Sequence, residues 1–256
     1  MTGTSDWLTA FPLQSATEAV DALMESWSTL AAHQKPGFHP KLHEPVLTKA
    51  LKTHAELVTG RRRGLLGHWS AENVILEMDL ETAEVQEERR TDIVYSFNTT
   101  TQSVALVFEF KKMSRFKADR DHYLGDKGLG RFVTGIYARG EAVAAMVAML
   151  TDPKHDVLTP LCEELSNAAR STTLRLRPSP TGGAFEAPST MFPAADFDTE
   201  HDRDAHLAPI HGTIRVAHFF LEFGYSVSSQ RSARSRKKIA KVELIEKALP
   251  QSGVRD

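Results

Sequence analysis

The 256-residue sequence contains a single cysteine, Cys162, so disulfide bonds within the chain are excluded. No apolar run approaches the ~20 residues that are needed to cross a bilayer. Met1 to Ala10 lacks the basic and then apolar pattern of a signal peptide. We therefore expect a cytoplasmic protein in a reducing compartment, with Cys162 as a small packing residue rather than a nucleophile.

The chain also lacks an excess of positive charge, since its net charge is −2. A tight, non-specific nucleic-acid binder is therefore disfavoured, although local basic segments are not excluded. Hydrophobic residues make up 41% and charged residues 25%, as in ordinary globular proteins. The length predicts one α/β domain over residues 37–225, with a helical extension at 1–36 and a basic tail at 226–256. The tail either contacts phosphates or docks on the domain, a second subunit of a homodimer or a partner protein.

The segment from Arg89 to Met113 has two apolar, β-branched and aromatic runs around a polar stretch, which predicts a β-hairpin. A turn centred at Thr100 and Thr101 would place Asp92 directly across from Glu109. Their Cβ atoms would then lie about 5 Å apart on the same face of the sheet. This register is an assumption, because a slip of one residue would turn Asp92 away.

Alternation along the second strand directs Glu109 and Lys111 to one face and Phe108 and Phe110 to the other. Facing carboxylates such as Asp92 and Glu109 repel each other unless a proton or a cation offsets their charge. Lys111 is one such cation, and a divalent metal ion would be a second. Two acids beside a lysine therefore suit metal-assisted attack on a phosphodiester. The alternative is a solvated hairpin face that happens to carry these residues.

Thr91 and Asp92, followed by a hairpin and by Glu109, Phe110 and Lys111, resemble the core motif of the PD-(D/E)xK nuclease superfamily. The resemblance implies that Asp92, Glu109 and the carbonyl of Phe110 bind Mg²⁺ or Mn²⁺. It also implies that Lys111 orients or activates the attacking water. Thr91 stands where the family often has proline, at a position that varies and carries no chemistry.

Pro40 to Thr59 is predicted to form an amphipathic helix, with Glu44 at the edge of its apolar stripe and Pro45 in its first turn. By the same resemblance, Glu44 is a candidate fourth member of the site that helps to hold the metal or its water shell. The alternative is a carboxylate that caps the N-terminus of the helix. These two interpretations remain equally open from the sequence.

Basic residues near the predicted hairpin are candidate phosphate contacts, because guanidinium and ammonium groups pair with phosphate oxygens. The candidates are Arg90, Lys112, Arg115 and Lys117. The arginine run between Gly60 and Gly64 is predicted to be a basic loop, either a solvated turn or a further phosphate contact.

The remaining elements are predicted from apolar spacing and turn residues. They are one or two strands at Leu65 to Leu80, a helix at Leu129 to Arg139, a buried strand at Ala142 to Leu150, a helix at 154–170, a strand at Thr172 to Arg177, a flexible loop at about 178–209, and a core strand at Ile214 to Phe223. Within residues 40–150, this order matches the α-β-β-β-α-β core of the restriction-endonuclease-like fold. That fold has a mixed central sheet flanked by helices.

We therefore expect a magnesium-dependent nuclease that acts on DNA rather than RNA, in a bacterial defence or mobile-element system. DNA and the biological setting are implied by the resemblance alone. The principal alternative is a nucleic-acid-binding or scaffold protein that keeps the fold without catalysis. A third is a zinc module built from His201, His206 and His211, whose spacing fits no familiar zinc site.

Overall fold

A computed structural model describes residues 11–78, 85–99, 103–209 and 211–225. For residues 72–78 and 85–90 it describes the main chain alone. The predicted basic tail at 226–256 and the first ten residues lie outside this range.

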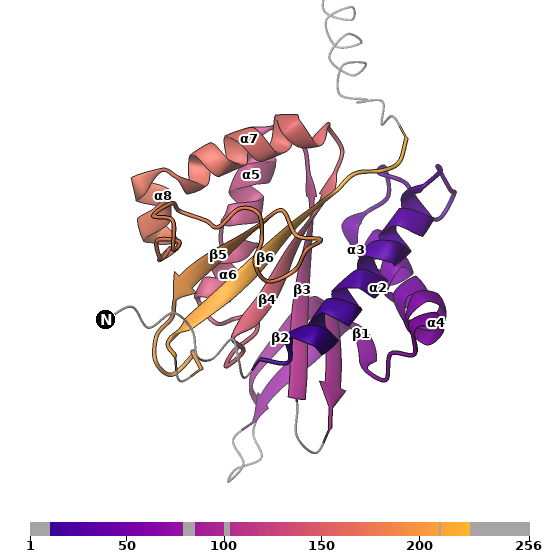
Figure 1. Ribbon diagram of the computed structural model, residues 1–256, viewed down its shortest axis with the longest axis horizontal. Coiled ribbons are helices and arrows are strands. Elements are labelled where there is room, and N and C mark those ends of the chain that lie inside the picture. The colour runs from indigo at the N-terminus through magenta and orange to yellow at the C-terminus, as the bar shows by residue number, and fades with distance from the viewer. Residues whose placement is uncertain (1–10, 79–84, 100–102, 210, 226–256) are drawn as a thin grey trace, which may run out of the picture. The chain divides into compact units, whose positions relative to one another are not determined.

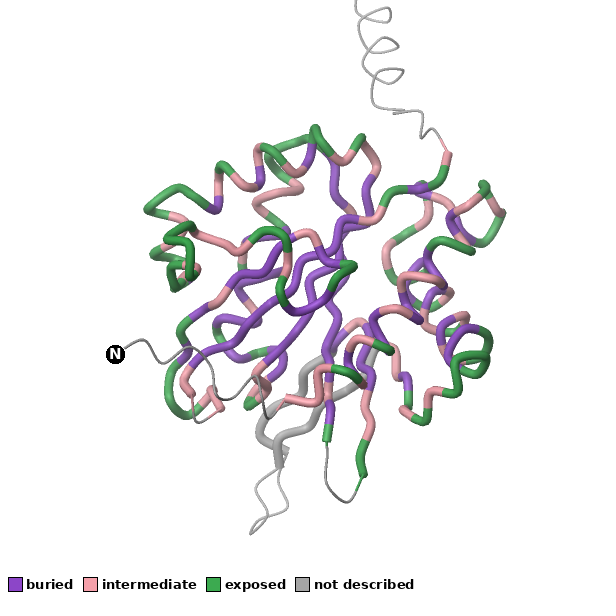
Figure 2. The backbone as a smooth tube through the Cα atoms, in the orientation of Figure 1, coloured by how far each residue is buried: buried purple, intermediate pink, exposed green. Residues whose placement is uncertain are grey.

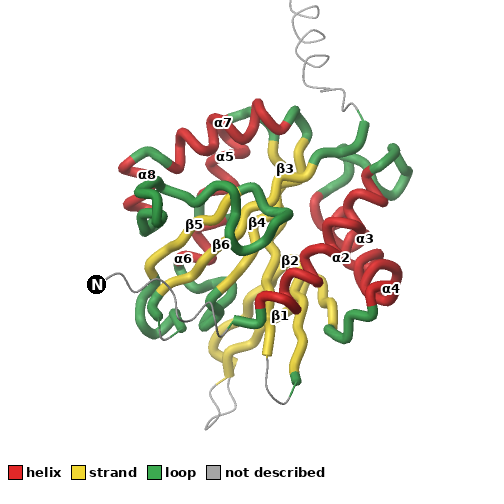
Figure 3. The backbone as a smooth tube through the Cα atoms, in the orientation of Figure 1, coloured by secondary structure: helices red, strands yellow, loops and turns green. Residues whose placement is uncertain are grey.

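A six-stranded mixed sheet forms the centre of the fold, which is α/β as predicted (Figures 1 and 3). The strands are β1 (His68–Met78), β2 (Val85–Asn98), β3 (Ser103–Met113), β4 (Val143–Leu150), β5 (Phe197–Asp202) and β6 (Thr213–Leu221). Their spatial order is β1-β2-β3-β4-β6-β5. The first three strands are antiparallel to one another, β4 is parallel to β3 and to β6, and β5 is antiparallel to β6. The predicted hairpin and the two predicted core strands are therefore confirmed.

Helices flank this sheet, and they form the connections from β3 to β4 and from β4 to β5 (Figure 1). They are α2 (Leu13–Ala31), α3 (Glu44–His54), the π-helix η1 (Ala55–Gly60), α4 (Arg61–Arg63), α5 (Lys117–Leu124), α6 (Leu129–Val133), α7 (Lys154–Leu165) and α8 (Ala168–Thr173). Pro45 lies in the first turn of α3, where its missing N–H leaves no helical hydrogen bond unmade. The Asn167 side chain accepts the Ala169 and Arg170 N–H groups and so begins α8.

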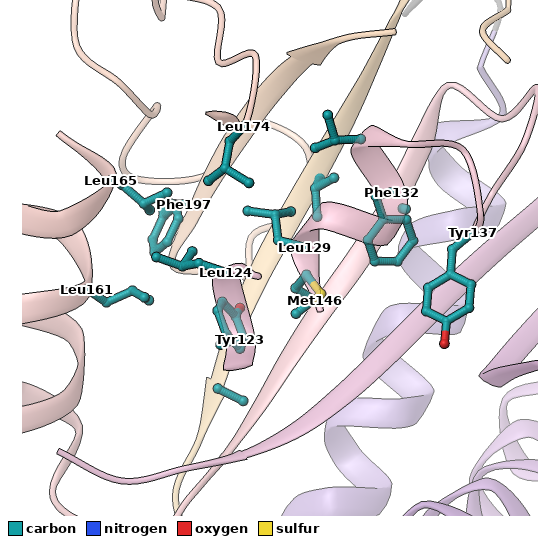
Figure 4. Packing of buried hydrophobic residues seen from close by; sticks show 14 of the residues in the cluster. Tyr123, Leu124, Leu129, Phe132, Tyr137, Met146, Leu161, Leu165, Leu174 and Phe197 are labelled. Atoms are coloured by element: carbon teal, nitrogen blue, oxygen red, sulfur yellow. The ribbon is translucent and has the colours of Figure 1, made fainter. Parts of the chain in front are cut away.

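One face of the sheet packs against α5, α6, α7 and the end of α8 in a single apolar cluster (Figure 4). Alternate residues of β3, among them Val107 and Met113, belong to this cluster. Glu109 and Lys111 lie between those two positions, and alternation therefore places them on the same face. Every residue of β4 is buried, as predicted for a central parallel strand, and burial is concentrated along the central strands (Figure 2).

The other face of the first three strands carries aromatic residues and is covered by α3. Phe108 stacks on Trp69 at 6.3 Å between ring centroids, and Trp69 in turn contacts Tyr95. Helix α2 packs on α3 and η1, where the Ser26 and Thr59 hydroxyl groups lie 2.5 Å apart. The predicted division of side chains between the two faces of β3 is therefore confirmed.

The predicted helix at Leu129 to Arg139 is wrong beyond Val133. Gly135 takes the left-handed φ of +69°, and the buried Arg203 side chain binds carbonyl groups of the following turn. The predicted strand at Thr172 to Arg177 is also wrong, because α8 continues to Thr173 and only Leu176 forms an isolated bridge, with His201. Both errors reflect tertiary contacts that apolar spacing does not encode.

The predicted flexible loop at about 178–209 contains an ordered edge strand, β5, which pairs with β6. Polar residues are accommodated within β5 because buried side chains such as Thr199 and His201 hydrogen bond to each other. The predicted basic loop at Gly60 to Gly64 is the short helix α4, which ends where Gly64 adopts a φ of +72°. Arg62 and Arg63 pair with Glu25 on α2, in accord with a structural role rather than phosphate contact. Over the ranges described above, none of the helices has the length and apolar character to span a bilayer.

Candidate active site

The β2–β3 ladder has the predicted register, in which Ile93 pairs with Phe108. Asp92 comes directly before Ile93, and its Oδ2 accepts the main-chain N–H of Phe110 at 2.8 Å. The Asp92 carboxylate thus accepts an N–H group of β3 just beyond the last main-chain pair of the β2–β3 ladder. The side chain of Asp92 is consequently fixed beside the segment that carries Glu109 and Lys111.

Glu109 and Lys111 are buried, with only 2% and 5% of their surfaces exposed. Lys111 Nζ lies 2.6 Å from Glu109 Oε1 and donates to the Phe110 carbonyl at 2.8 Å. The second oxygen of Glu109, Oε2, is buried and receives no hydrogen bond from the N–H and O–H groups of the described residues, although the Glu109 and Asp92 carboxyls can hydrogen bond when they share a proton. These residues therefore do not form the solvated hairpin face that was the alternative interpretation of the sequence.

Glu44 reaches the same place from the first turn of α3. Its Oε1 lies 3.3 Å from Lys111 Nζ, and its Oε2 accepts the main-chain N–H of Lys112 at 2.9 Å. The residue that precedes the helix is His43, and no side-chain hydrogen bond caps the helix. Glu44 thus joins Asp92, Glu109 and Lys111 instead of capping α3. We call these four residues the acid–lysine cluster.

Two acidic side chains of the cluster, Asp92 and Glu109, resist ionisation. Burial, reinforced by the negative charge of Asp92, raises the pKa of Glu109 to about 8. Burial also raises the pKa of Asp92, against the opposing charge of Lys111. Burial by itself would lower the pKa of Lys111, but the three surrounding carboxylates outweigh it and the pKa is raised. Lys111 is therefore a fixed ammonium group at neutral pH.

Three carboxylates share one ammonium group in this cluster, so full ionisation leaves an excess of negative charge. A buried excess of this kind favours either a bound proton or a bound cation. The donors that fit a hard cation are Asp92, the buried Oε2 of Glu109 and the carbonyl oxygen of Phe110. Across the described ranges, no three Asp, Glu, His or Cys side chains are grouped to hold a metal ion. Glu44 contacts Lys111 and the main chain of Lys112 here, and its metal role stays a prediction.

The sequence analysis missed three residues near the cluster. His122 on α5 lies within electrostatic reach of Lys111 and Glu44, which have opposing effects on it; burial is the main cause of its lowered pKa. Tyr137 senses the charges of Glu109 and Asp92, although burial is the main reason that its pKa is raised. The Arg131 guanidinium donates to the Tyr137 hydroxyl. Gly135 was the sequence feature that could have indicated the position of Tyr137, since a glycine inside the predicted helix indicates that the chain could turn there.

Lys112 is not a phosphate contact of the predicted kind. Its Nζ donates to the carbonyl groups of Pro40 at 2.6 Å and Leu42 at 3.0 Å, and burial lowers its pKa. Lys117 is exposed and pairs with Asp121 one helical turn away. The other two predicted contacts are Arg115, which is exposed beyond the end of β3, and Arg90, whose side chain lies outside the described part of the structure.

The histidines proposed for a zinc module do not form one in the described part of the chain. His201 is fully buried, with Nδ1 on the Leu174 carbonyl at 2.7 Å and Nε2 on the Thr199 hydroxyl at 2.8 Å. Thr199 also contacts His218, whose other ring nitrogen contacts Tyr123. His218 is thus a core histidine with both ring nitrogens hydrogen bonded.

Burial lowers the pKa of His201 to about 4 and that of His218 well below 6.5, so both rings are neutral at pH 7. Cys162 is partly buried, and burial raises its pKa to about 11, which leaves little thiolate at neutral pH. Neither group therefore competes with the acid–lysine cluster as a reactive centre.

No protein-family model, curated protein or solved structure matches this chain. The chemistry that the described residues allow is accordingly the basis for a functional assignment. Asp92 and Glu109 are buried acids that favour a bound cation, and they lie beside the fixed ammonium group of Lys111. This arrangement is suited to hydrolysis of an anionic ester.

Proposed function

We propose that the chain is a metal-dependent nuclease that hydrolyses phosphodiester bonds in nucleic acid, with DNA as its substrate. The observation that carries the proposal is the juxtaposition of Asp92, Glu109 and Lys111, in which the buried Oε2 of Glu109 receives no hydrogen bond from the N–H groups of the described residues. A carboxylate buried in this way is destabilising unless a cation or proton satisfies it. Metal binding explains why the Glu109 carboxylate is buried here despite this cost.

The order of elements gives independent support. Helix α3 precedes three antiparallel strands, the helical segment α5–α6 follows, and β4 then runs parallel to β3. This is the α-β-β-β-α-β arrangement expected for the restriction-endonuclease-like core. In this proposal, Asp92 and Glu109 take the roles of the motif acids.

In this proposal, Asp92, Glu109 and the Phe110 carbonyl would hold Mg²⁺ or Mn²⁺. The bound metal would supply Lewis-acid activation of water and stabilise developing negative charge. Lys111, fixed by Glu109 and the Phe110 carbonyl, orients the attacking water or stabilises charge on the phosphate. Glu44 restrains Lys111 and the main chain of Lys112 from the α3 side.

The test is cleavage of supercoiled plasmid, linear duplex, single-stranded DNA and RNA with Mg²⁺, Mn²⁺ or EDTA. The variants are Asp92→Asn and Lys111→Ala, with Lys117→Ala as the matched exposed-lysine control and circular dichroism as a check of folding. Wild type and the control should cleave DNA only with metal, whereas both site variants should lose about 100-fold or more. Equal activity in all four proteins would remove the assignment. Binding without cleavage by wild type would favour the non-catalytic alternative.

A further inference from the structure

Arg131, on α6, is a cation that contacts Tyr137 in the turn that follows this helix. Its Nε donates to the Asp126 carbonyl at 3.2 Å, its Nη1 donates to the Tyr137 hydroxyl, and its guanidinium lies 5.0 Å from the Tyr137 ring centroid. Within the described residues, no Asp or Glu side chain forms an ion pair with it and its Nη2 makes no hydrogen bond to protein. A guanidinium has five N–H donors, so several remain available to a ligand.

Tyr137 connects this cation to the candidate active site. Only 3% of its surface is exposed, and Figure 4 shows its ring at the edge of the apolar cluster, beside Phe132 and apart from Tyr123. The hydroxyl lies within electrostatic reach of Glu109 and Asp92, and also of Arg131, whose charge has the opposite effect on it. Tyr137 also belongs to the same buried cluster as Met146, which pairs with Glu109 across the β3–β4 ladder, so Tyr137 packs on the part of the sheet that carries the acids.

Hydrogen bonds from the Arg203 side chain hold the turn that carries Tyr137 in place. This buried guanidinium donates to the carbonyl groups of Phe132 at 2.7 Å, Ala138 at 2.7 Å and Tyr137 at 2.9 Å. Gly135 has a left-handed φ of +69°, and a Cβ there would lie 2.9 Å from the side chain of Leu207. The position of Tyr137 is thus determined by the interior of the domain rather than by a solvated loop.

We propose that Arg131, positioned by Tyr137, binds a non-bridging oxygen of a DNA phosphate at the candidate active site. This inference rests on the proposed nuclease function and adds a substrate contact to it. The excess of carboxylates in the cluster repels an anionic substrate, and a nearby guanidinium offsets that repulsion. The planar fork of arginine matches two phosphate oxygens, which a single ammonium group does not.

The experiment compares wild type, Arg131→Ala, Arg131→Lys and Tyr137→Phe. Arg177→Ala is the control, because Arg177 is a half-exposed arginine that pairs with Asp202 at the far edge of the sheet. Steady-state cleavage of a duplex oligonucleotide gives KM and kcat, and fluorescence anisotropy in EDTA gives the salt dependence of binding. Thermal melting identifies any variant that fails to fold, in which case Arg131→Lys is used for the comparison.

Arg131→Ala should raise KM about 10-fold or more with a smaller change in kcat, and should reduce the slope of log Kd against log salt by about 1. Arg131→Lys should recover part of the affinity, Tyr137→Phe should fall between wild type and Arg131→Ala, and Arg177→Ala should stay within about 2-fold of wild type. A wild-type KM and salt slope in Arg131→Ala would overturn the phosphate contact while leaving a metal-dependent nuclease intact. Absence of both cleavage and DNA binding in wild type would overturn both proposals.

Discussion

Glu44 Oε2 accepts the main-chain N–H of Lys112 at 2.9 Å, across a separation of 68 residues in the sequence. Its other oxygen lies 3.3 Å from Lys111 Nζ, so a single carboxylate joins α3 to both the main chain and the buried ammonium of β3. These two contacts connect the first turn of α3 to β3, the strand that carries Glu109. The relationship makes Glu44 a positioning residue for Lys111.

Replacement of Glu44 by alanine should lower the free energy of unfolding by about 1 to 2 kcal/mol, because two charge-assisted hydrogen bonds are lost. Glu44→Gln should recover most of this stability, since its amide oxygen can still accept the Lys112 N–H. Urea denaturation measures both changes. Glu56→Ala is the control, as Glu56 only pairs with Lys52 on the helical surface and should cost about 0.5 kcal/mol or less. Equal losses for Glu44→Ala and Glu56→Ala would contradict the assigned role.

Replacement of Lys112 by methionine should lower the free energy of unfolding by about 1 to 3 kcal/mol. The change removes the donor to the Pro40 and Leu42 carbonyl groups while keeping the apolar part of the side chain. Lys117→Met should change stability by about 0.5 kcal/mol or less, because its ion pair is exposed. Chemical denaturation of the two variants distinguishes a structural lysine from a surface one. A stable Lys112→Met protein with weakened DNA binding would instead restore the phosphate-contact interpretation.

Glu109 should make the metal-free protein less stable as the pH rises from about 4.5 to about 8. Its folded pKa is about 8 and its ordinary value is 4.5, so between these values the folded state binds a proton that the unfolded state has released. Glu109→Gln should remove this dependence and stabilise the protein at pH 8 by about 1 kcal/mol or more, while abolishing cleavage. Urea titrations in EDTA across this range test the sign. Stability that rises with pH equally in both proteins would show that Glu109 is not the group responsible.

The buried histidines should make the protein less stable as the pH falls below 6.5. The pKa of His201 is lowered to about 4 and that of His218 is also lowered, so the unfolded chain takes up protons that the folded chain refuses. This contribution is fully present above pH 6.5 and is lost progressively toward pH 4. The loss of stability is best measured in the Glu109→Gln variant, because Glu109 itself makes the protein more stable as the pH falls. A flat stability curve between pH 6.5 and 5 would contradict it.

Breaking the histidine chain at its centre provides a separate test. Thr199→Val removes the hydroxyl between His201 and His218, leaves buried ring nitrogens unsatisfied, and should cost about 1 to 3 kcal/mol. Thr172→Val is the control, because the exposed Thr172 hydroxyl contacts only the main chain of its own helix. Unfolding free energies at pH 7.5 compare the two. Similar costs at both positions would mean that the buried chain adds no stability.

The sequence by itself determined the hairpin and the face on which Glu109 and Lys111 lie, whereas its register was an assumption that the structure confirmed. It also determined the two central strands that became β4 and β6. These features follow from spacings of two residues, from a polar turn and from unbroken apolar runs, all of which are local properties of the chain. Asp92 could be placed near Glu109 for the same reason, since a short turn fixes which residues of a hairpin face each other.

Only the tertiary structure decided that Glu44 joins the cluster instead of capping α3, and that Lys112 binds carbonyl groups of the preceding loop. It also decided that the turn after α6 brings Tyr137 into the same buried cluster as Met146, which pairs with Glu109, and into contact with Arg131. Each outcome depends on contacts between segments that are far apart in the sequence or on a main-chain turn imposed by a distant side chain, as Arg203 imposes the turn before β4. Local periodicity cannot encode such contacts, because they exist only once the helices have packed on the sheet.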